Sequence, residues 1–377
     1  MNFKPEHEFA IIKLNDFIEN HLHDYSSKRN YDFGPDDRSN ISGLSPFISH
    51  RVLFEYDIVK KVLSKFPYLK VEKFVQEIFW RTYWKGWLEL RPDVWNDFKM
   101  SLTTLTKDDN YFKAINGQTN IDCFNDWVNE LKKYNYLHNH TRMWFASIWI
   151  FTLNLPWQLG SEFFLKHLYD ADTASNTLSW KWVAGLQTKG KHYLARSDNI
   201  EKFTNKRYNN IKLNTSAPPI TEGNEYLIAD RNFKNFNQVN NSLIIFDTDL
   251  FIKEKIIDNY EAIFLIENSN ATRNIMLSDN VVLFKSNLLK NIKSYNDKIS
   301  ILSNEDIKIL FNKNKKFDVI YPFIGQNLDL LNSLKNEHDL KLNVLFREED
   351  VFCWQFSNKG FFNFKKNIPK IISMFSL

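Results

Sequence analysis

Two short stretches near the middle of the chain decide its fold: residues 134–143 read YNYLHNHTRM, and residues 170–182 read DADTASNTLSWKW. They stand in the part of the chain that is richest in tryptophan, because ten of the eleven tryptophans lie between Trp80 and Trp182. Tryptophan is a large, flat side chain with a single polar atom. Its recurrence beside Arg, Asn and Asp predicts a site that handles a flat ligand or an electron.

Two segments upstream belong with these stretches. In residues 77–81, which read EIFWR, the side chains of Glu77, Trp80 and Arg81 share one face of a helix with Trp84. The simpler interpretation of that face is a helix packed by tryptophan with charges at its rim. Residues 42–46 read SGLSP, a loop of small residues whose backbone N–H groups can face a phosphate.

Arg142 lies in an apolar helical pattern, so its guanidinium points inward and needs a carboxylate, which Asp170 or Asp172 can supply. The string HNH at residues 138–140 raises the alternative of an HNH nuclease. We reject this alternative because the string lies in a helix and no companion metal ligands follow it. The sequence therefore predicts no metal site.

Taken together, these four motifs resemble the flavin-binding domain of the DNA photolyase and cryptochrome family, over roughly residues 20–210. The resemblance implies an FAD cofactor. The loop residues and Arg81 would hold its pyrophosphate and ribityl chain, Arg142 and Asp170 would form a buried pair against the flavin ring, Asp172 would accept from the polar edge of the ring, and Asn176 would lie near its N5 atom. The implied cofactor-binding residues are Tyr25, Ser42, Leu44, Ser45, Arg81, Arg142, Asp170, Asp172 and Asn176.

The resemblance also implies a substrate and an electron path. Family members that repair cyclobutane pyrimidine dimers use a lesion pocket whose residue types all match here, at Glu77, Trp80, Asn139, Met143 and Trp182. Glu77 and Asn139 would hydrogen-bond the pyrimidines and Trp80 and Trp182 would form flat walls. A carboxyl group between tryptophan rings should have a raised pKa. Trp180 and Trp157 match the first two members of the family's electron relay, and the third is missing. Either another aromatic residue such as Trp149 replaces it, or light-driven reduction of the flavin is weak.

The pattern changes after a Pro-Pro linker at residues 215–222. Residues 1–214 predict a helical domain, and residues 223–377 predict a Rossmann-like parallel α/β domain with strands at 243–246, 262–266, 281–284, 299–302, 318–321 and 342–346. Residues 243–250 and 360–369 resemble pieces of the family's antenna domain, which usually comes first, so the domain order would be permuted. A second, antenna chromophore is left open.

The composition sets limits on the setting. The chain has 377 residues, 25% of them charged, a net charge of +4 and two distant cysteines, Cys123 and Cys353. We expect a cytoplasmic protein with no disulfide framework and, because no apolar run reaches about 18 residues, no membrane span. We also expect a monomer. A basic stretch at residues 181–212 favours a polyanion partner, although a solvated loop would look the same.

The sequence therefore predicts a deoxyribodipyrimidine photolyase that acts on single- or double-stranded damaged DNA. The main alternative is a cryptochrome-like photoreceptor with the same flavin site and no repair. A photolyase for six-four photoproducts would want a histidine pair in the pocket, where Asn139 stands after His138. A flavoprotein that only retains FAD would be favoured if the C-terminal domain buried Trp80 or Trp182.

Overall fold

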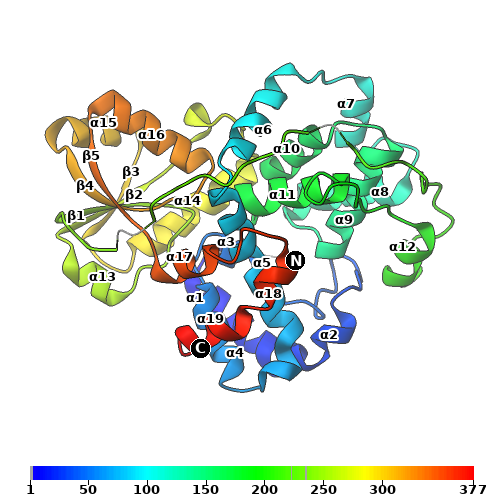
Figure 1. Cartoon of the computed structure of the whole chain (residues 1–377), viewed down its shortest axis with the longest axis horizontal. Helices are drawn as coiled ribbons and strands as arrows, with labels where there is room; N and C mark the ends of the chain where they lie inside the picture. The colour runs from blue at the N-terminus through cyan, green and yellow to red at the C-terminus, as the bar shows by residue number, and fades with distance from the viewer. Residues whose placement is uncertain (1–2, 222, 234–235) are drawn as a thin grey trace.

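The computed structural model describes residues 3–221, 223–233 and 236–377. Figure 1 shows two parts side by side: a bundle of helices, and a parallel sheet covered by helices. The long helix α5 (Tyr68–Glu89) lies between them and contacts both α11 (Thr173–Ala184) and α17 (Glu348–Trp354). The predicted class, a helical part followed along the chain by a parallel α/β part, is confirmed.

The helical part contains most of the remaining α-helices. They are α1 (His7–Asp16), α2 (Tyr25–Lys28), α3 (Ser45–Ser49), α4 (Glu55–Leu63), α6 (Asp93–Thr104), α7 (Asp109–Ile115), α8 (Asp122–Tyr134), α9 (Asn139–Ser147), α10 (Trp157–His167) and α12 (Ser197–Phe203). Two π-helical turns, Phe17–His21 and Ile148–Thr152, extend α1 and α9. Proline marks the breaks, because Pro67 and Pro156 precede α5 and α10, and Pro92 follows the end of α5.

The sheet has the order β3-β2-β1-β4-β5, and every pairing is parallel. The elements are β1 (Ser242–Phe246), α13 (Glu254–Asn259), β2 (Ala262–Ile266), α14 (Asp279–Lys293), β3 (Ile299–Leu302), α15 (Asn304–Lys313), β4 (Lys316–Ile320), α16 (Gln326–His338) and β5 (Lys341–Leu345). The central strand β1 is apolar on both faces and almost wholly buried, as a strand between two helical layers must be. Five of the six predicted strands are confirmed, each shifted by at most two residues.

The prediction of a strand at residues 281–284 is wrong, because these residues belong to α14. Val281 and Phe284 face the core together with Leu288 and Ile292, which is the spacing of a helix. Four apolar residues are too few to show which period they follow. Only the continuation to residue 293 settles the assignment.

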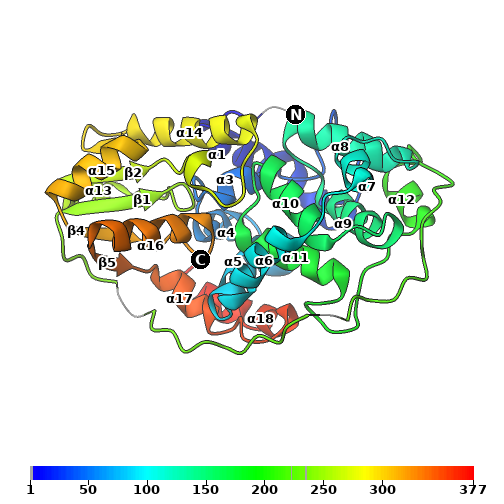
Figure 2. The same cartoon turned by 90° about the horizontal axis from the view of Figure 1, so that it is seen from above.

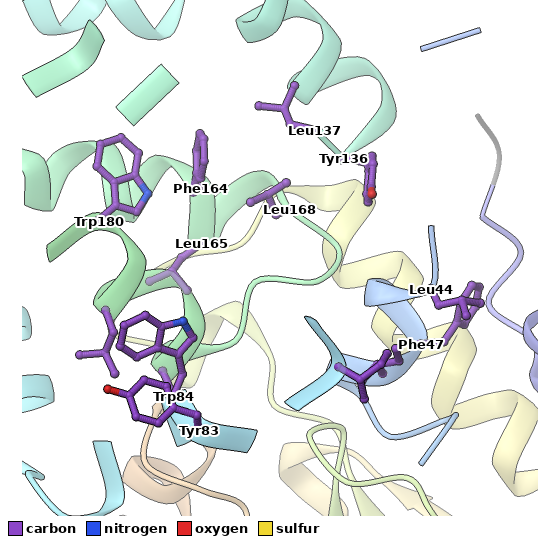
Figure 3. Close-up of a cluster of buried hydrophobic side chains, with 14 of the residues drawn as sticks. Leu44, Phe47, Tyr83, Trp84, Tyr136, Leu137, Phe164, Leu165, Leu168 and Trp180 are labelled. Carbon is purple, nitrogen blue, oxygen red and sulfur yellow. The ribbon is translucent and has the colours of Figure 1, made fainter. Parts of the chain in front are cut away.

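Large aromatic side chains fill the core of the helical part (Figure 3). Trp180 of α11 packs edge-on against Phe164 of α10, with 5.1 Å between ring centroids. A methyl group added at Gly160 would lie 2.3 Å from the Trp180 ring, so this glycine lets α10 and α11 approach closely. The site residues just before α11 are thereby held against a rigid pair of helices.

A long connection joins the two parts, and Figure 2 shows it running along one edge of the molecule. The described residues between α12 and β1 form no helix or strand, so the irregular stretch is longer than the expected linker. It is nevertheless fixed to the helical part: the ammonium of Lys181 lies 4.8 Å from the Tyr226 ring centroid, and Arg231 pairs with Glu89 at 2.6 Å. The boundaries at residues 214 and 223 stay a prediction.

The end of the chain returns to the helical part. After β5, α17, α18 (Phe361–Lys365) and α19 (Ile368–Met374) follow, and α17 and α18 pack against α5. A methyl group added at Gly86 of α5 would lie 2.4 Å from the Trp354 ring of α17, so the two helices touch closely. None of the helices in the described ranges is long and apolar enough to cross a membrane.

A buried charge cluster joins the two parts. Arg51, between α3 and α4, is fully buried and donates to both carboxylate oxygens of Asp350, at 2.6 and 2.7 Å. It also donates to Asp249, which follows β1, at 2.9 Å, and to Glu55 at 3.1 Å. Arg347 completes the cluster with two bonds to Asp249, at 2.6 and 2.7 Å. Burial alone would raise the pKa of Asp249, but Arg347 and Arg51 outweigh it and hold that pKa at about 2.

We predict that Arg51→Met lowers the free energy of unfolding by about 3–5 kcal/mol, because it leaves three buried carboxylates without their shared cation. Chemical denaturation followed by circular dichroism measures this change. The matched control is Arg196→Met, whose ion pair with Asp198 is 67% exposed on both sides. This control should cost less than about 1 kcal/mol. Equal stability of the two variants would contradict the role assigned to Arg51.

Candidate functional site

A buried ion pair forms the centre of the site. Arg142 of α9 donates two parallel hydrogen bonds to Asp170, at 3.0 and 2.9 Å, and the Ser45 hydroxyl donates to the same carboxylate. Asp170 is 2% exposed, and burial alone would raise its pKa. Arg142, Arg81 and Ser45 outweigh burial and hold the pKa of Asp170 below its usual value. The predicted Arg142–Asp170 contact is therefore present in the structure.

Asp172 lies at the start of α11 and has two partners. Its Oδ1 accepts from the backbone N–H of Ser175 at 2.9 Å, which caps the helix, and its Oδ2 pairs with Arg81 of α5. Arg81 also donates to the Asp170 carbonyl at 3.3 Å. The aspartates just before α11 thus bring α5 and α9 together around one patch of charge.

Asn176 stands one helical turn into α11 and is 8% exposed. Its Nδ2 donates to the backbone carbonyl and to the hydroxyl of Ser161, both at 2.9 Å. A backbone carbonyl can only accept, so the amide group must direct its nitrogen toward Ser161. The Oδ1 atom is left to accept a hydrogen bond from a donor in the site.

The loop at residues 42–45 and Tyr25 contribute in different ways. Ser42 Oγ accepts from the backbone N–H of Leu44 at 3.4 Å, while Gly43 has a φ of 58°, a left-handed conformation that favours glycine. The Leu44 side chain is fully buried, so only its backbone could reach a ligand. Tyr25 packs edge-on against Phe17 and Phe74, and burial raises its pKa strongly.

A second charged network fixes the start of α9. Asp32 is fully buried, accepts from Thr141 near the start of α9, and pairs with Arg38, which also pairs with Glu130. His138 caps α9, because its Nδ1 accepts from the backbone N–H of His140 at 3.1 Å. Burial lowers the pKa of His138 to about 3, so its ring is neutral. This network fixes the helix end that carries Asn139. No local sequence motif predicted it.

The five side chains of the predicted lesion pocket are accessible. Asn139 is exposed, and Met143, one turn further along α9, is half-buried, as are Glu77, Trp80 and Trp182. The two α9 residues lie one turn apart on the same helix as Arg142. The two α5 residues lie within the turn before Arg81, which pairs with Asp172. The pocket residues therefore come from the same three helices, α5, α9 and α11, that supply the charged patch.

Two neighbours of this group were not foreseen. Arg29 pairs with Glu77 at 2.7 Å, and the ring of Phe361 in α18 stacks on Trp80 with 3.5 Å between centroids and 12° between planes. Burial raises the pKa of Glu77, while Arg29 acts against that shift. Trp80 is thus covered on one side by the end of the chain and remains half-buried rather than closed off.

The tryptophans proposed as an electron relay have separate neighbours. Trp180 meets Trp149 edge-on at 6.2 Å, and Trp149 meets Tyr111 at 6.0 Å. Trp157 instead stacks on Phe98 at 5.7 Å, and Phe98 stacks on Trp95 at 5.6 Å. Trp149 and Tyr111 are both buried, so the first series is a run of buried rings that begins at Trp180.

Comparison with known proteins agrees with these features. Residues 74–212 match a family model described as the FAD binding domain of DNA photolyase. Deoxyribodipyrimidine photo-lyases of Streptomyces griseus and Agrobacterium fabrum are each 30% identical, over 186 and 189 residues, which is 45% and 48% of this chain. The matches cover 41% and 38% of those two relatives, so the chain spans well under half of their length.

A solved structure, a bacterial class III photolyase from Agrobacterium tumefaciens, aligns with a TM-score of 0.46 and 26% identity. The alignment covers 53% of this chain and 43% of that one.

The residues present fit an FAD molecule. A diphosphate needs hydroxyl and cationic donors, which Ser42, Ser45 and Arg81 provide. A flavin ring needs acceptors for its N–H groups, which Asp172 and the free Oδ1 of Asn176 provide. The buried Arg142–Asp170 pair is costly for folding alone and is accounted for if a ligand rests on it. These side chains could therefore hold FAD, and their roles toward it stay a prediction.

We predict that Asp170→Asn lowers the FAD content of the purified protein at least about tenfold, because Arg142 and Arg81 lose the carboxylate that orients them. The ratio of absorbance at about 450 nm to protein absorbance measures FAD content, and circular dichroism checks the fold. The control is Asp258→Asn, at an exposed position of α13. A folded Asp170→Asn protein with full FAD would contradict the role of this carboxylate.

Proposed function

We propose that the chain is a member of the DNA photolyase and cryptochrome family that carries the FAD-binding domain and repairs cyclobutane pyrimidine dimers in DNA by light-driven electron transfer. One observation carries the proposal: a complete set of lesion-pocket side chains lies accessible on α5, α9 and α11, beside the Arg142–Asp170 pair. A photoreceptor without repair has no need of that set.

In this proposal the bound FAD supplies the excitable electron donor, and the protein supplies position and electrostatics. Ser42, Ser45 and Arg81 hold the phosphates, Arg142 and Asp170 form a polar floor, and Asp172 accepts from the flavin ring. The Oδ1 of Asn176 faces the ring because its Nδ2 is held by Ser161. A neutral amide there tolerates negative charge on a reduced flavin better than a carboxylate would.

The lesion residues have distinct roles. Trp80 and Trp182 offer flat apolar walls to a dinucleotide flipped out of the helix, and Met143 fills the space between helices. The Asn139 amide reads the polar edge of the pyrimidines. Glu77 has a raised pKa, so a proton on this carboxyl can be shared with a substrate oxygen that gains negative charge.

The surface beyond the pocket supplies phosphate contacts. Most basic residues of the 181–212 stretch are exposed, among them Lys191, Lys202, Lys206 and Lys212. Lys181 differs from the rest, because it is 6% exposed and lies over the Tyr226 ring, so it cannot reach DNA. Exposed lysines that face phosphates give binding that weakens as salt rises.

A cryptochrome-like photoreceptor is the second candidate, and one observation favours it. Phe361 stacks on one face of Trp80, and Arg29 pairs with Glu77, so two pocket side chains already have partners. A lesion must stack on the other face of Trp80. It must also either displace Arg29 from Glu77 or bind Arg29 together with Glu77. If a lesion cannot gain these contacts with Trp80 and Glu77, the same fold binds FAD without repairing DNA.

The deciding experiment is repair of a thymine-dimer oligonucleotide by purified, chemically reduced, FAD-loaded protein, in light and in the dark. We expect dimer loss in light alone. Asn139→Ala should slow repair about tenfold, the cost of roughly one hydrogen bond of 1.4 kcal/mol, with FAD content unchanged. Asn274→Ala, at an exposed residue of the sheet part, is the matched control. Loaded protein that never repairs the dimer favours the photoreceptor.

The route by which light reduces the flavin yields a separate prediction. We propose that Trp180 and Trp149 carry it, with Tyr111 as the outer member, since their rings are in contact. Under blue light with an external thiol, Trp149→Phe should slow reduction of bound FAD at least about tenfold. Trp157→Phe, the matched control, should slow it less. The reverse order of effects would assign the relay to Trp157, as the family pattern implies.

A further inference from the structure

A cavity lies where the sheet meets the helical part. Its walls come from the residues after β1 and β4 and from α5, α10 and the start of α11. In the order β3-β2-β1-β4-β5, the strands that follow β1 are added first on one side of it and then on the other. The carboxyl ends of β1 and β4 therefore border the switch point, where open parallel sheets bind ligands.

Charged side chains of both signs line this cavity. Three carboxylates contribute, and each has its own cation: Asp247 pairs with Lys285 at 2.7 Å, Glu89 with Arg231 at 2.6 Å, and Asp172 with Arg81. Two further cations, Lys85 and Arg273, line the same cavity. Among the ion pairs formed by the described residues, neither has a carboxylate partner. Lys85 and Arg273 are therefore the two lining cations that form no ion pair.

Of the two cations, Lys85 gives the stronger evidence for a bound anion. It is 3% exposed, and its ammonium has no hydrogen-bond partner within the described part of the chain. It lies over the Phe323 ring, 3.9 Å from the ring centroid. Burial lowers the pKa of Lys85 to about 8, so the ammonium still carries its charge at neutral pH. Three unused donors on a buried charge cost stability unless an acceptor enters the cavity.

The start of α16 adds backbone donors to the same wall. Gly325, Gln326 and Asn327 line the cavity, and no side chain caps this thirteen-residue helix. Its first N–H groups therefore point outward at the positive end of the helix dipole. A methyl group at Gly325 would lie 2.3 Å from the Thr173 hydroxyl, so the glycine keeps this end of α16 in contact with the first residue of α11.

We infer that this cavity is a binding site for an oxyanion of the phosphate class, held by Lys85, Arg273 and the first N–H groups of α16. Phosphate matches each donor, since it accepts several hydrogen bonds and carries up to two charges at neutral pH. Glu77, Asn139, Met143 and Trp80 do not line the cavity, so the site is separate from the proposed lesion pocket. The ligand is free phosphate or the phosphate end of a small molecule.

The test is a titration of the full-length protein with inorganic phosphate at constant ionic strength, followed by calorimetry and by Tm. We expect one site per chain and a rise in Tm of roughly 2–5 °C at saturation. Lys85→Met should abolish both effects. Without phosphate, this variant should be at least as stable as the unaltered protein, because it removes an unpaired buried charge. Lys308→Met, at an exposed position of α15, is the matched control and should bind normally.

The variant Arg273→Gln tests the second cation of the cavity independently. We expect it to bind phosphate about tenfold more weakly than the unaltered protein. An adenosine monophosphate titration then separates the two sources of the anion: tighter binding than inorganic phosphate identifies a phosphate ester, and weaker binding identifies the free ion. If phosphate fails to bind the unaltered protein, or if Lys85→Met and Lys308→Met respond to it alike, the inference is wrong. Both titrations use FAD-loaded protein, because Asp172 of the proposed FAD site also lines the cavity, and neither needs light or DNA repair.

Discussion

The burial of Arg51 is the constraint on which the arrangement of the two parts depends. Its guanidinium is fully buried and shared by carboxylates at residues 55, 249 and 350, which belong to the helical part, the end of β1 and α17. Buried ion pairs add little stability over apolar packing, but a buried cation with a missing carboxylate is heavily penalised. The cluster therefore acts mainly by excluding other arrangements of sheet and helices. It also holds α17 against α5, the helix that carries Glu77, Trp80 and Arg81.

The site follows from this placement because its residues come from three helices and a loop. Asp170 and Asp172 precede α11, and each is shared with a cation from another helix, Arg142 of α9 or Arg81 of α5. None of these helices could present the charged patch alone. The tight contact of α10 with α11 at Gly160 keeps Asn176 directed at Ser161, so the rigidity of the core sets the orientation of the one neutral amide in the site.

The sequence was informative where a signal is local. The apolar strands are complete within a few residues each, and Arg142 could be paired with Asp170 because a charge on an apolar helix face needs a partner. The prediction of a strand at residues 281–284 was wrong because four apolar residues do not distinguish the spacing of a strand from that of a helix. The Phe361–Trp80 stack and the Arg29–Glu77 pair join residues 281 and 48 positions apart, and no pattern within either segment encodes them. The cavity beside Lys85 is lined by segments between residues 49 and 327, and no pattern within any one of them predicts it.

The order of the parts along the chain makes the helical core depend on both of its ends. Phe361 and Phe364 pack against Trp80, Tyr83 and Phe79 of α5, so the last helices complete a surface that the first two hundred residues leave open. Bringing them there requires the long connection after α12 to span the molecule, and ordering that connection costs chain entropy. Its contacts through Tyr226 and Arg231 offset part of this cost. The wall of the proposed lesion pocket behind Trp80 is therefore completed by a segment that follows the sheet in the chain, so the accessible face of Trp80 depends on how the sheet part and the helical part fit together.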